Sequence, residues 1–162
     1  MKITAEYLHR KWKSISYYDG GYIQVEVKHS LEWHVGYKEI DQKTLVIVSE
    51  KEPELLQTSK SIAVSKGRRM DGRWALSFAL MRIEQDSVFE LLCADLIAYS
   101  QSAENETAAL ALTAKRYKQW NKLLEHQRKS LMDEINRKGL LGELTYLCSV
   151  IDSGYPIFAA VQ

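Results

Sequence analysis

The stretch NETAALALTAKRYKQWNKLLEHQRKSLMDEINRKGLLGEL, residues 105–144, decides the fold of this chain. Apolar side chains recur in it at steps of three and four residues, which predicts one face of a long helix. This apolar stripe consists of Leu110, Ala114, Tyr117, Trp120, Leu124, Leu131 and Ile135. Asn105 or Thr107 can cap the start, and Gly139 ends the pattern. We expect this helix to span the molecule, or to break near Gln127, and a third helix to follow from residue 139.

The residues before this helix predict a sheet. Period-two alternation predicts a strand over 22–28, and further strands are expected over 33–37, 45–48, 61–65 and 73–81. Asp71-Gly72 indicates a hairpin turn between the last two. The predicted fold is therefore α+β: a small, mostly antiparallel sheet from about 15 to 82, followed by three helices, one of them long. We divide the chain into an N-terminal helix plus sheet, 1–84, and a helical region, 85–162.

Composition gives an ordinary globular protein with a formal net charge of +1. No apolar run approaches the roughly 18 residues of a membrane span, and the N-terminus lacks the apolar segment of a signal peptide. We therefore expect a cytoplasmic protein without a membrane partner. Thr4 is expected to cap a short helix that ends near Ser14. Cys93 and Cys148 lie far apart in apolar helical contexts, which favours buried thiols.

Charge is unevenly placed along the long helix. Between residues 115 and 138 there are eight Lys or Arg against three acids. Such a strip can meet phosphates, with an affinity that depends on salt. The predicted nucleic-acid contacts are Lys115, Arg116, Lys122, Arg128 and Lys129. The alternative is a solvated helix face supported by pairs such as Glu125 with Lys129.

Two acidic arrangements are candidates for chemistry. The first is Asp19 with Glu26 and Lys28, which are the residue types of a Mg²⁺-dependent nuclease. An exposed strand after a glycine turn commonly has the same residue types without any catalytic role. Glu143 is the one acid in an apolar helical turn, a placement that favours either a functional carboxylate or a rim carboxylate at a helix N-terminus. The four histidines lack the spacing of a zinc site, so we predict no metal ligands.

Several short motifs resemble a bacterial family of PD-(D/E)XK motif proteins found beside restriction and phage-defence genes. They are Phe89 with Cys93-Ala94-Asp95-Leu96-Ile97, Arg116 with Trp120, Gly139-Leu140-Leu141-Gly142-Glu143-Leu144 with Leu147, and, upstream, Trp33-His34-Val35-Gly36, Leu45-Val46-Ile47-Val48 and Asp71-Gly72-Arg73-Trp74 with Leu76. The likeness covers most of residues 30–150.

The resemblance implies a Mg²⁺-dependent nuclease in which Glu143 corresponds to the acid of the helix that precedes the catalytic sheet. No Asp…Glu-x-Lys follows Glu143, and the chain stops at Gln162. We therefore expect the N-terminal portion of a DNA endonuclease of a restriction or defence system, inactive alone, with Mg²⁺ implied only for the full-length family. Its expected partners are DNA, bound weakly and without sequence preference, and a second copy or another defence subunit. The alternatives are a non-catalytic adaptor, and a self-sufficient nuclease built on Asp19, Glu26 and Lys28.

Overall fold

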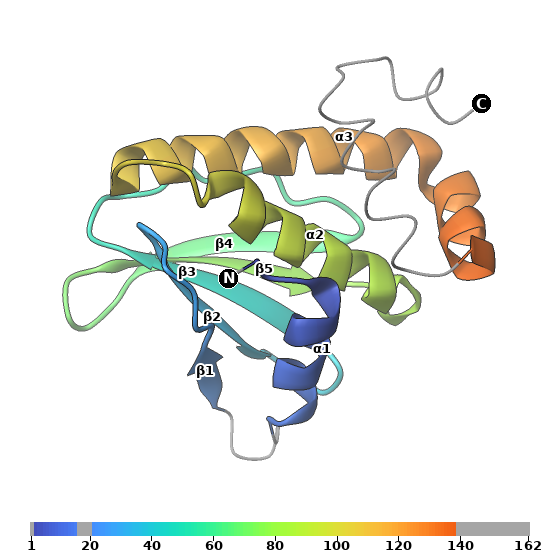
Figure 1. Ribbon diagram of the computed structural model, residues 1–162, viewed down its shortest axis with the longest axis horizontal. Coiled ribbons are helices and arrows are strands. Elements are labelled where there is room, and N and C mark those ends of the chain that lie inside the picture. Colours follow the sequence, from blue (N-terminus) through green and yellow to red (C-terminus); the bar gives the residue numbers. More distant parts are fainter. Residues whose placement is uncertain (1, 16–20, 139–162) are drawn as a thin grey trace.

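The computed structural model describes residues 2–15 and 21–138, and the side chains of these ranges up to residue 124. Five strands form one sheet in the order β1-β2-β3-β5-β4, with every neighbouring pair antiparallel. Three α-helices and a short 3-10 helix complete the described part. The predicted α+β fold with an antiparallel sheet is confirmed. In the described ranges the helices gather in one layer over the sheet (Figure 1).

The strands follow the apolar alternation closely. Their bounds are β1 Tyr22–Gln24, β2 Glu32–Tyr37, β3 Lys43–Ser49, β4 Ile62–Arg68 and β5 Trp74–Leu80. β2 and β3 form the first expected hairpin, and β4 and β5 form the second. The second hairpin joins the sheet through β5, which lies between β3 and β4. This arrangement leaves β1 and β4 as the edge strands.

The strand predicted over 22–28 is shorter in the structure. After Gln24 only Val25 continues the pairing, donating its N–H to Trp33 O at 2.8 Å. The chain then turns toward the end of the second helix, where the His29 ring lies 2.9 Å from Ser100 Oγ. Ser30 Oγ also donates to Ala103 O. Tertiary contacts therefore replace the sheet pairing that the alternation predicted.

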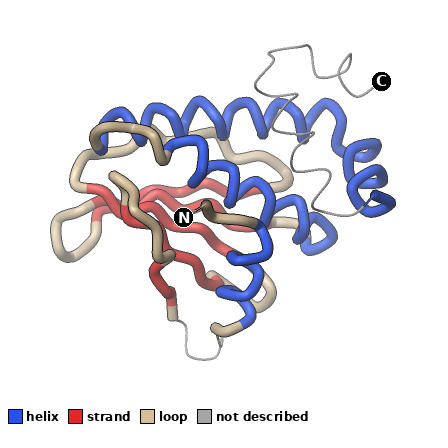
Figure 2. The backbone as a smooth tube through the Cα atoms, viewed as in Figure 1, coloured by secondary structure: helices blue, strands red, loops and turns tan. Residues whose placement is uncertain are grey.

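The helices begin where capping residues allow. Helix α1 is Ala5–Lys13, and its cap Thr4 accepts the N–H of Tyr7 at 3.1 Å. The 3-10 helix η2, Ile83–Gln85, leads into α2, Asp86–Ser100. Helix α3 is Glu106–Lys138, with Asn105 accepting the N–H of Ala108 at 2.9 Å. Figure 2 shows the strands together in one sheet and the helices beside it.

The long helix is continuous through Gln127, so it does not break there as the alternative expected. Its last turns bend away from the axis of the earlier turns (Figure 1). The third helix expected from residue 139 lies outside the described residues. None of the described helices combines the length and apolar character that a membrane span requires.

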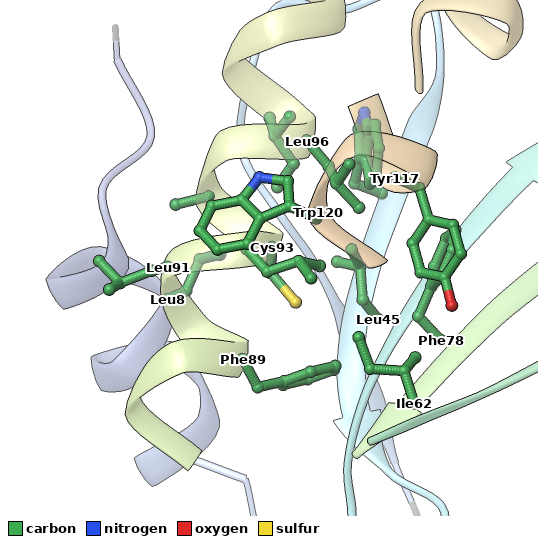
Figure 3. Packing of buried hydrophobic residues seen from close by; sticks show 14 of the residues in the cluster. Leu8, Leu45, Ile62, Phe78, Phe89, Leu91, Cys93, Leu96, Tyr117 and Trp120 are labelled. Carbon is green, nitrogen blue, oxygen red and sulfur yellow. The ribbon is translucent and has the colours of Figure 1, made fainter. Parts of the chain in front are cut away.

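One apolar core joins the sheet to all three helices. Figure 3 shows Leu8 of α1, Cys93 of α2 and Trp120 of α3 packing above the strands. Phe78 of β5 contributes a ring whose centroid lies 5.1 Å from that of Tyr117. Cys93 is the buried thiol expected from sequence, and burial raises its pKa well above the ordinary value. Residues of the two regions predicted at 1–84 and 85–162 thus share one core, while the division itself stays a prediction.

Candidate nucleic-acid interface

Helix α3 has an inner face against α2 and the sheet and an outer face in solvent. Thr113, Tyr117 and Trp120 are buried on the inner face, at the three- and four-residue spacing that the sequence predicts. Lys115 and Lys122 are exposed, and their separation of seven residues, two helical turns, places them on the same side of α3. The outer face therefore carries the cations that remain available to a partner.

Arg116 belongs to the inner face. Its side chain is only 2% exposed, and its Nε and Nη2 donate to the two carboxylate oxygens of Asp95 at 2.6 and 3.2 Å. The indole N–H of Trp120 donates to the same carboxylate at 2.6 Å, and the guanidinium lies 4.3 Å from the ring centroid of Tyr99. The expectation that Arg116 contacts nucleic acid is wrong, because this residue lies one helical turn before Trp120 and shares its buried face.

Lys118 lies between Lys115 and Lys122 along the helix and has a carboxylate partner. Its Nζ is 2.8 Å from Glu54 Oε1, and both side chains are more than half exposed. Glu54 belongs to the connection between β3 and β4, which also sends Glu52 to Lys66 at 2.9 Å. This connection therefore lies between the outer face of α3 and the edge strand β4, and it places two carboxylates beside their cations.

A second buried ionic cluster connects α1, β3 and α2. Lys43 Nζ lies 2.9 Å from Glu90 Oε2 and 2.8 Å from Asp86 Oδ1. The ring nitrogen Nδ1 of His9 approaches the same Glu90 oxygen at 2.7 Å. Burial lowers the pKa of Lys43, but the hydrogen bonds to Asp86 and Glu90 outweigh it, so the pKa is raised overall. Sequence reasoning missed this cluster because its members come from three elements and follow no common spacing.

The described residues do not fit the Mg²⁺ site that the resemblance implies. No group of three or more His, Cys, Asp or Glu side chains in the described ranges is placed to hold a metal ion. The buried carboxylates of Asp95 and Glu90 already accept hydrogen bonds from cationic or N–H donors. A divalent cation requires free oxygen ligands, so these carboxylates are structural.

The candidate trio of Asp19, Glu26 and Lys28 is not assembled in the described part of the chain. Strand β1 ends at Gln24, before Glu26 and Lys28, and both of these side chains are exposed. Glu26 instead approaches Lys11 of α1 at 4.0 Å. Asp19 lies outside the described residues.

Three other predicted site residues also fall outside what the structure describes. Glu143 lies beyond residue 138, and for Arg128 and Lys129 only the helical backbone is described. Their assignments stay predictions.

Comparison with known proteins identifies the family. The family described as "Putative PD-(D/E)XK family member" (DUF4420) matches residues 8–162, nearly the whole chain. The chain therefore belongs to this PD-(D/E)XK family, and the resemblance drawn from its motifs is confirmed. Searches among curated proteins and among solved structures found no match.

Proposed function

We propose that this chain provides DNA contacts for a Mg²⁺-dependent endonuclease of a bacterial restriction or phage-defence system in the cytoplasm. The observation that carries the proposal is the pair of exposed lysines, Lys115 and Lys122, on the outer face of α3 in a chain of the PD-(D/E)XK family. Lysine side chains that face solvent lose little free energy when they contact a phosphate, and the contact releases counterions from DNA. In the sequence Lys129 continues the seven-residue spacing of Lys115 and Lys122.

The test is DNA binding as a function of salt. A fluorescent duplex of about 30 base pairs should bind the chain weakly, without sequence preference, and with an affinity that falls steeply from 50 to 200 mM salt. The variant Lys115→Gln/Lys122→Gln should bind more weakly and reduce the slope of log affinity against log salt by about 1.8, since each phosphate contact contributes about 0.9. No binding at 50 mM salt, or binding without salt dependence, would contradict the proposal.

The matched control removes the same charge from the far side of the molecule. Lys13, at the end of α1, and Lys38, after β2, are both exposed. In Figure 1 the end of α1 lies at the other end of the helical layer from α3, with α2 between them. The variant Lys13→Gln/Lys38→Gln should therefore keep the salt slope of the unmodified chain. An equal loss in both variants would mean that only net charge matters and that α3 is not the interface.

The same proposal holds that this chain alone does not cleave DNA. It is supported by the absence of a metal-binding cluster among the described residues. Incubating the purified chain with supercoiled plasmid and Mg²⁺ should leave the plasmid intact. Nicking that disappears with EDTA and with Glu143→Gln would instead assign catalysis to this chain.

A second candidate function, a non-catalytic adaptor, is favoured by a different surface. A shallow hollow of about 620 Å³ lies at the end of the sheet, beside the exposed side chains of Ile40, Met81 and Ile83. Apolar side chains gathered at a hollow mark protein contacts more often than isolated ones do. If the adaptor function is the right one, Ile40→Ser/Met81→Ser should abolish association of the chain with itself or with a defence subunit while leaving DNA affinity unchanged.

A further inference from the structure

The hairpin between β4 and β5 has an ordered tip. Arg69 N donates to Arg73 O at 2.7 Å, and Gly72 N donates to Arg69 O at 3.0 Å. Gly72 has a φ of +86°, which an L side chain adopts only with strain. The Asp71 carboxylate accepts the backbone N–H of Arg73 at 3.0 Å, and this bond comes first among the causes that lower its pKa. The tip is therefore a fixed turn that presents its side chains in one arrangement, and it projects from the sheet as the green loop of Figure 1.

The hairpin is strongly cationic. Lys66, Arg68, Arg69 and Arg73 face a single acid within the hairpin, Asp71. Arg73 is held by Asp71 and by Glu32 of β2, at 3.1 and 2.9 Å, and Arg69 approaches Asp71 at 3.5 Å.

Arg68 differs from the other arginines of the hairpin. Its guanidinium lies 5.7 Å from the ring centroid of Trp74, its Nε donates to Gly72 O, and the described ranges give it no carboxylate partner. Lys66 lies over the same indole at 5.6 Å. Stacking on an aromatic ring holds a cation in place while its outward side stays in water. Arg68 is therefore positioned in advance for an anion.

Met70 stands at the point of the turn and is fully exposed, at 108%. Single apolar side chains in open solvent are common, so the exposure alone assigns no role, but Met70 follows directly on Arg68 and Arg69 at the tip. Methionine is one of the residues with which proteins wedge between base steps, while flanking arginines contact the phosphates on either side. A lipid surface fits less well, because the neighbours of Met70 at the tip are Asp71 and Gly72 and membrane insertion needs a larger apolar area.

The hairpin also adjoins the cationic face of α3. Lys66 in the stem and Lys118 on α3 bind Glu52 and Glu54, two residues apart in one segment. Lys51 N, in the same segment, donates to Glu106 at the start of α3. The two cationic elements therefore flank a single short stretch of chain, and one duplex can contact both.

We propose that the β4–β5 hairpin enters a groove of duplex DNA, with Arg68 and Arg69 on phosphates and Met70 wedged against or between base pairs. This inference rests on the proposed function in that DNA is the ligand, but it assigns a separate element and adds a deformation of the duplex. Phosphate neutralisation anchors the hairpin, and the apolar wedge unstacks a base step and kinks the DNA.

The experiment uses the full chain and a duplex of about 30 base pairs with donor and acceptor dyes at its ends. Binding of the unmodified chain should raise energy transfer, because a kink brings the ends together. Met70→Ser should abolish that rise and leave the salt slope unchanged. Arg68→Gln/Arg69→Gln should weaken binding several-fold and lower the slope by about 1.8. Tyr22→Ser, which removes an exposed large side chain from the edge strand β1, is the matched control and should change neither readout.

The outcomes separate this inference from the α3 proposal. If Lys115→Gln/Lys122→Gln weakens binding and the hairpin variants do not, the hairpin inference is overturned and α3 stands. If only the hairpin variants weaken binding, the hairpin stands and α3 falls. DNA binding without any change in energy transfer would overturn the proposed wedging of Met70. The same holds if Met70→Ser weakens binding of the chain to anionic vesicles but has no effect on DNA. Thermal unfolding of each variant confirms that the exposed substitutions leave the fold intact.

Discussion

The inner and outer faces of α3 both carry basic residues, which are paired in the core on the inner face and exposed to solvent on the outer face. On the inner face Arg116 is buried and forms two hydrogen bonds to Asp95, whereas one residue earlier Lys115 is exposed. A buried charge is retained only with a partner, and removal of that partner leaves an uncompensated charge in the core. The comparison shows that a run of basic residues counts as a binding surface only after its helical phase is known.

The largest effect is expected from breaking the inner pair. Arg116→Ala removes the guanidinium that pairs with the buried Asp95 carboxylate, and we expect a loss of about 3–5 kcal/mol in the free energy of unfolding. Lys115→Ala, its neighbour on the outer face, should change that free energy by less than about 0.5 kcal/mol. Urea denaturation followed by tryptophan fluorescence measures both.

If Arg116→Ala fails to fold, the double variant Asp95→Leu/Arg116→Met keeps the comparison testable. Replacing both charges by apolar side chains of similar size should recover most of the lost stability, since such exchanges are often neutral. Equal destabilisation by Arg116→Ala and Lys115→Ala would remove the distinction between the two faces.

A smaller effect on stability is expected at His29, a partly buried polar residue that contacts the end of α2. Its Nδ1 accepts the N–H of Leu31 at 3.0 Å, and its Nε2 lies within 3.2 Å of Ile97 O and 2.9 Å of Ser100 Oγ. The ring also packs edge-on against Trp33. His29→Ala should therefore cost about 1–2 kcal/mol of stability at pH 7.5, measured by urea denaturation.

The same contacts give His29 a pH dependence with a definite sign. Burial lowers the pKa of His29 below the ordinary 6.5, and the hydrogen bond to Ile97 O only partly opposes it. The unfolded chain then binds the proton more readily, so the stabilisation is complete above pH 6.5 and is lost as the pH falls from there through the lowered pKa of the folded state. The difference in stability between the unmodified chain and His29→Ala should shrink from pH 7.5 to 5.5. An NMR titration that places the His29 pKa above 6.5 would contradict this sign.

Sequence reasoning predicted elements better than it predicted their partners. Apolar alternation and capping located the strands and the start of α3 at Asn105, because these signals are local. The pairing of β5 with β3, and the departure of His29 from the sheet toward Ser100, depend on tertiary packing that no local pattern contains. Apart from β1, the strand bounds therefore follow from the sequence to within a few residues, while the pairing of β5 with β3 does not.

The candidate site shows the same limit, with one signal that was available. Arg116 lies four residues before Trp120, so the apolar stripe of the helix already assigned it to the buried face. The pairing of Lys43 with Glu90 could not be foreseen, because β3 and α2 meet only in the folded chain. The hairpin turn at Asp71-Gly72 was predicted from the sequence, but the full exposure of Met70 required the structure.

The smallest effect sharpens the comparison within the outer face itself. The Lys118–Glu54 pair is solvent-exposed, and such pairs contribute only about 0–1 kcal/mol, so neither Lys118→Gln nor Glu54→Gln should alter stability strongly. Their effects on DNA should differ in sign. Glu54→Gln removes an acid beside the cationic face and frees Lys118, so affinity at 50 mM salt should rise and the salt slope should increase by about 0.9. Glu39→Gln, an exposed acid on the β2–β3 turn, is the matched control and should have less effect.

Lys118→Gln completes this test. Because Glu54 already compensates the charge of Lys118, its removal should lower DNA affinity less than Lys115→Gln does, although both remove one exposed lysine from the same helix. Equal losses of DNA affinity in the two variants would mean that the ion pair with Glu54 does not weaken the contact of Lys118 with phosphate. The outer face would then act as a uniform cationic surface, and the carboxylates of residues 52 and 54 would have no part in setting its affinity.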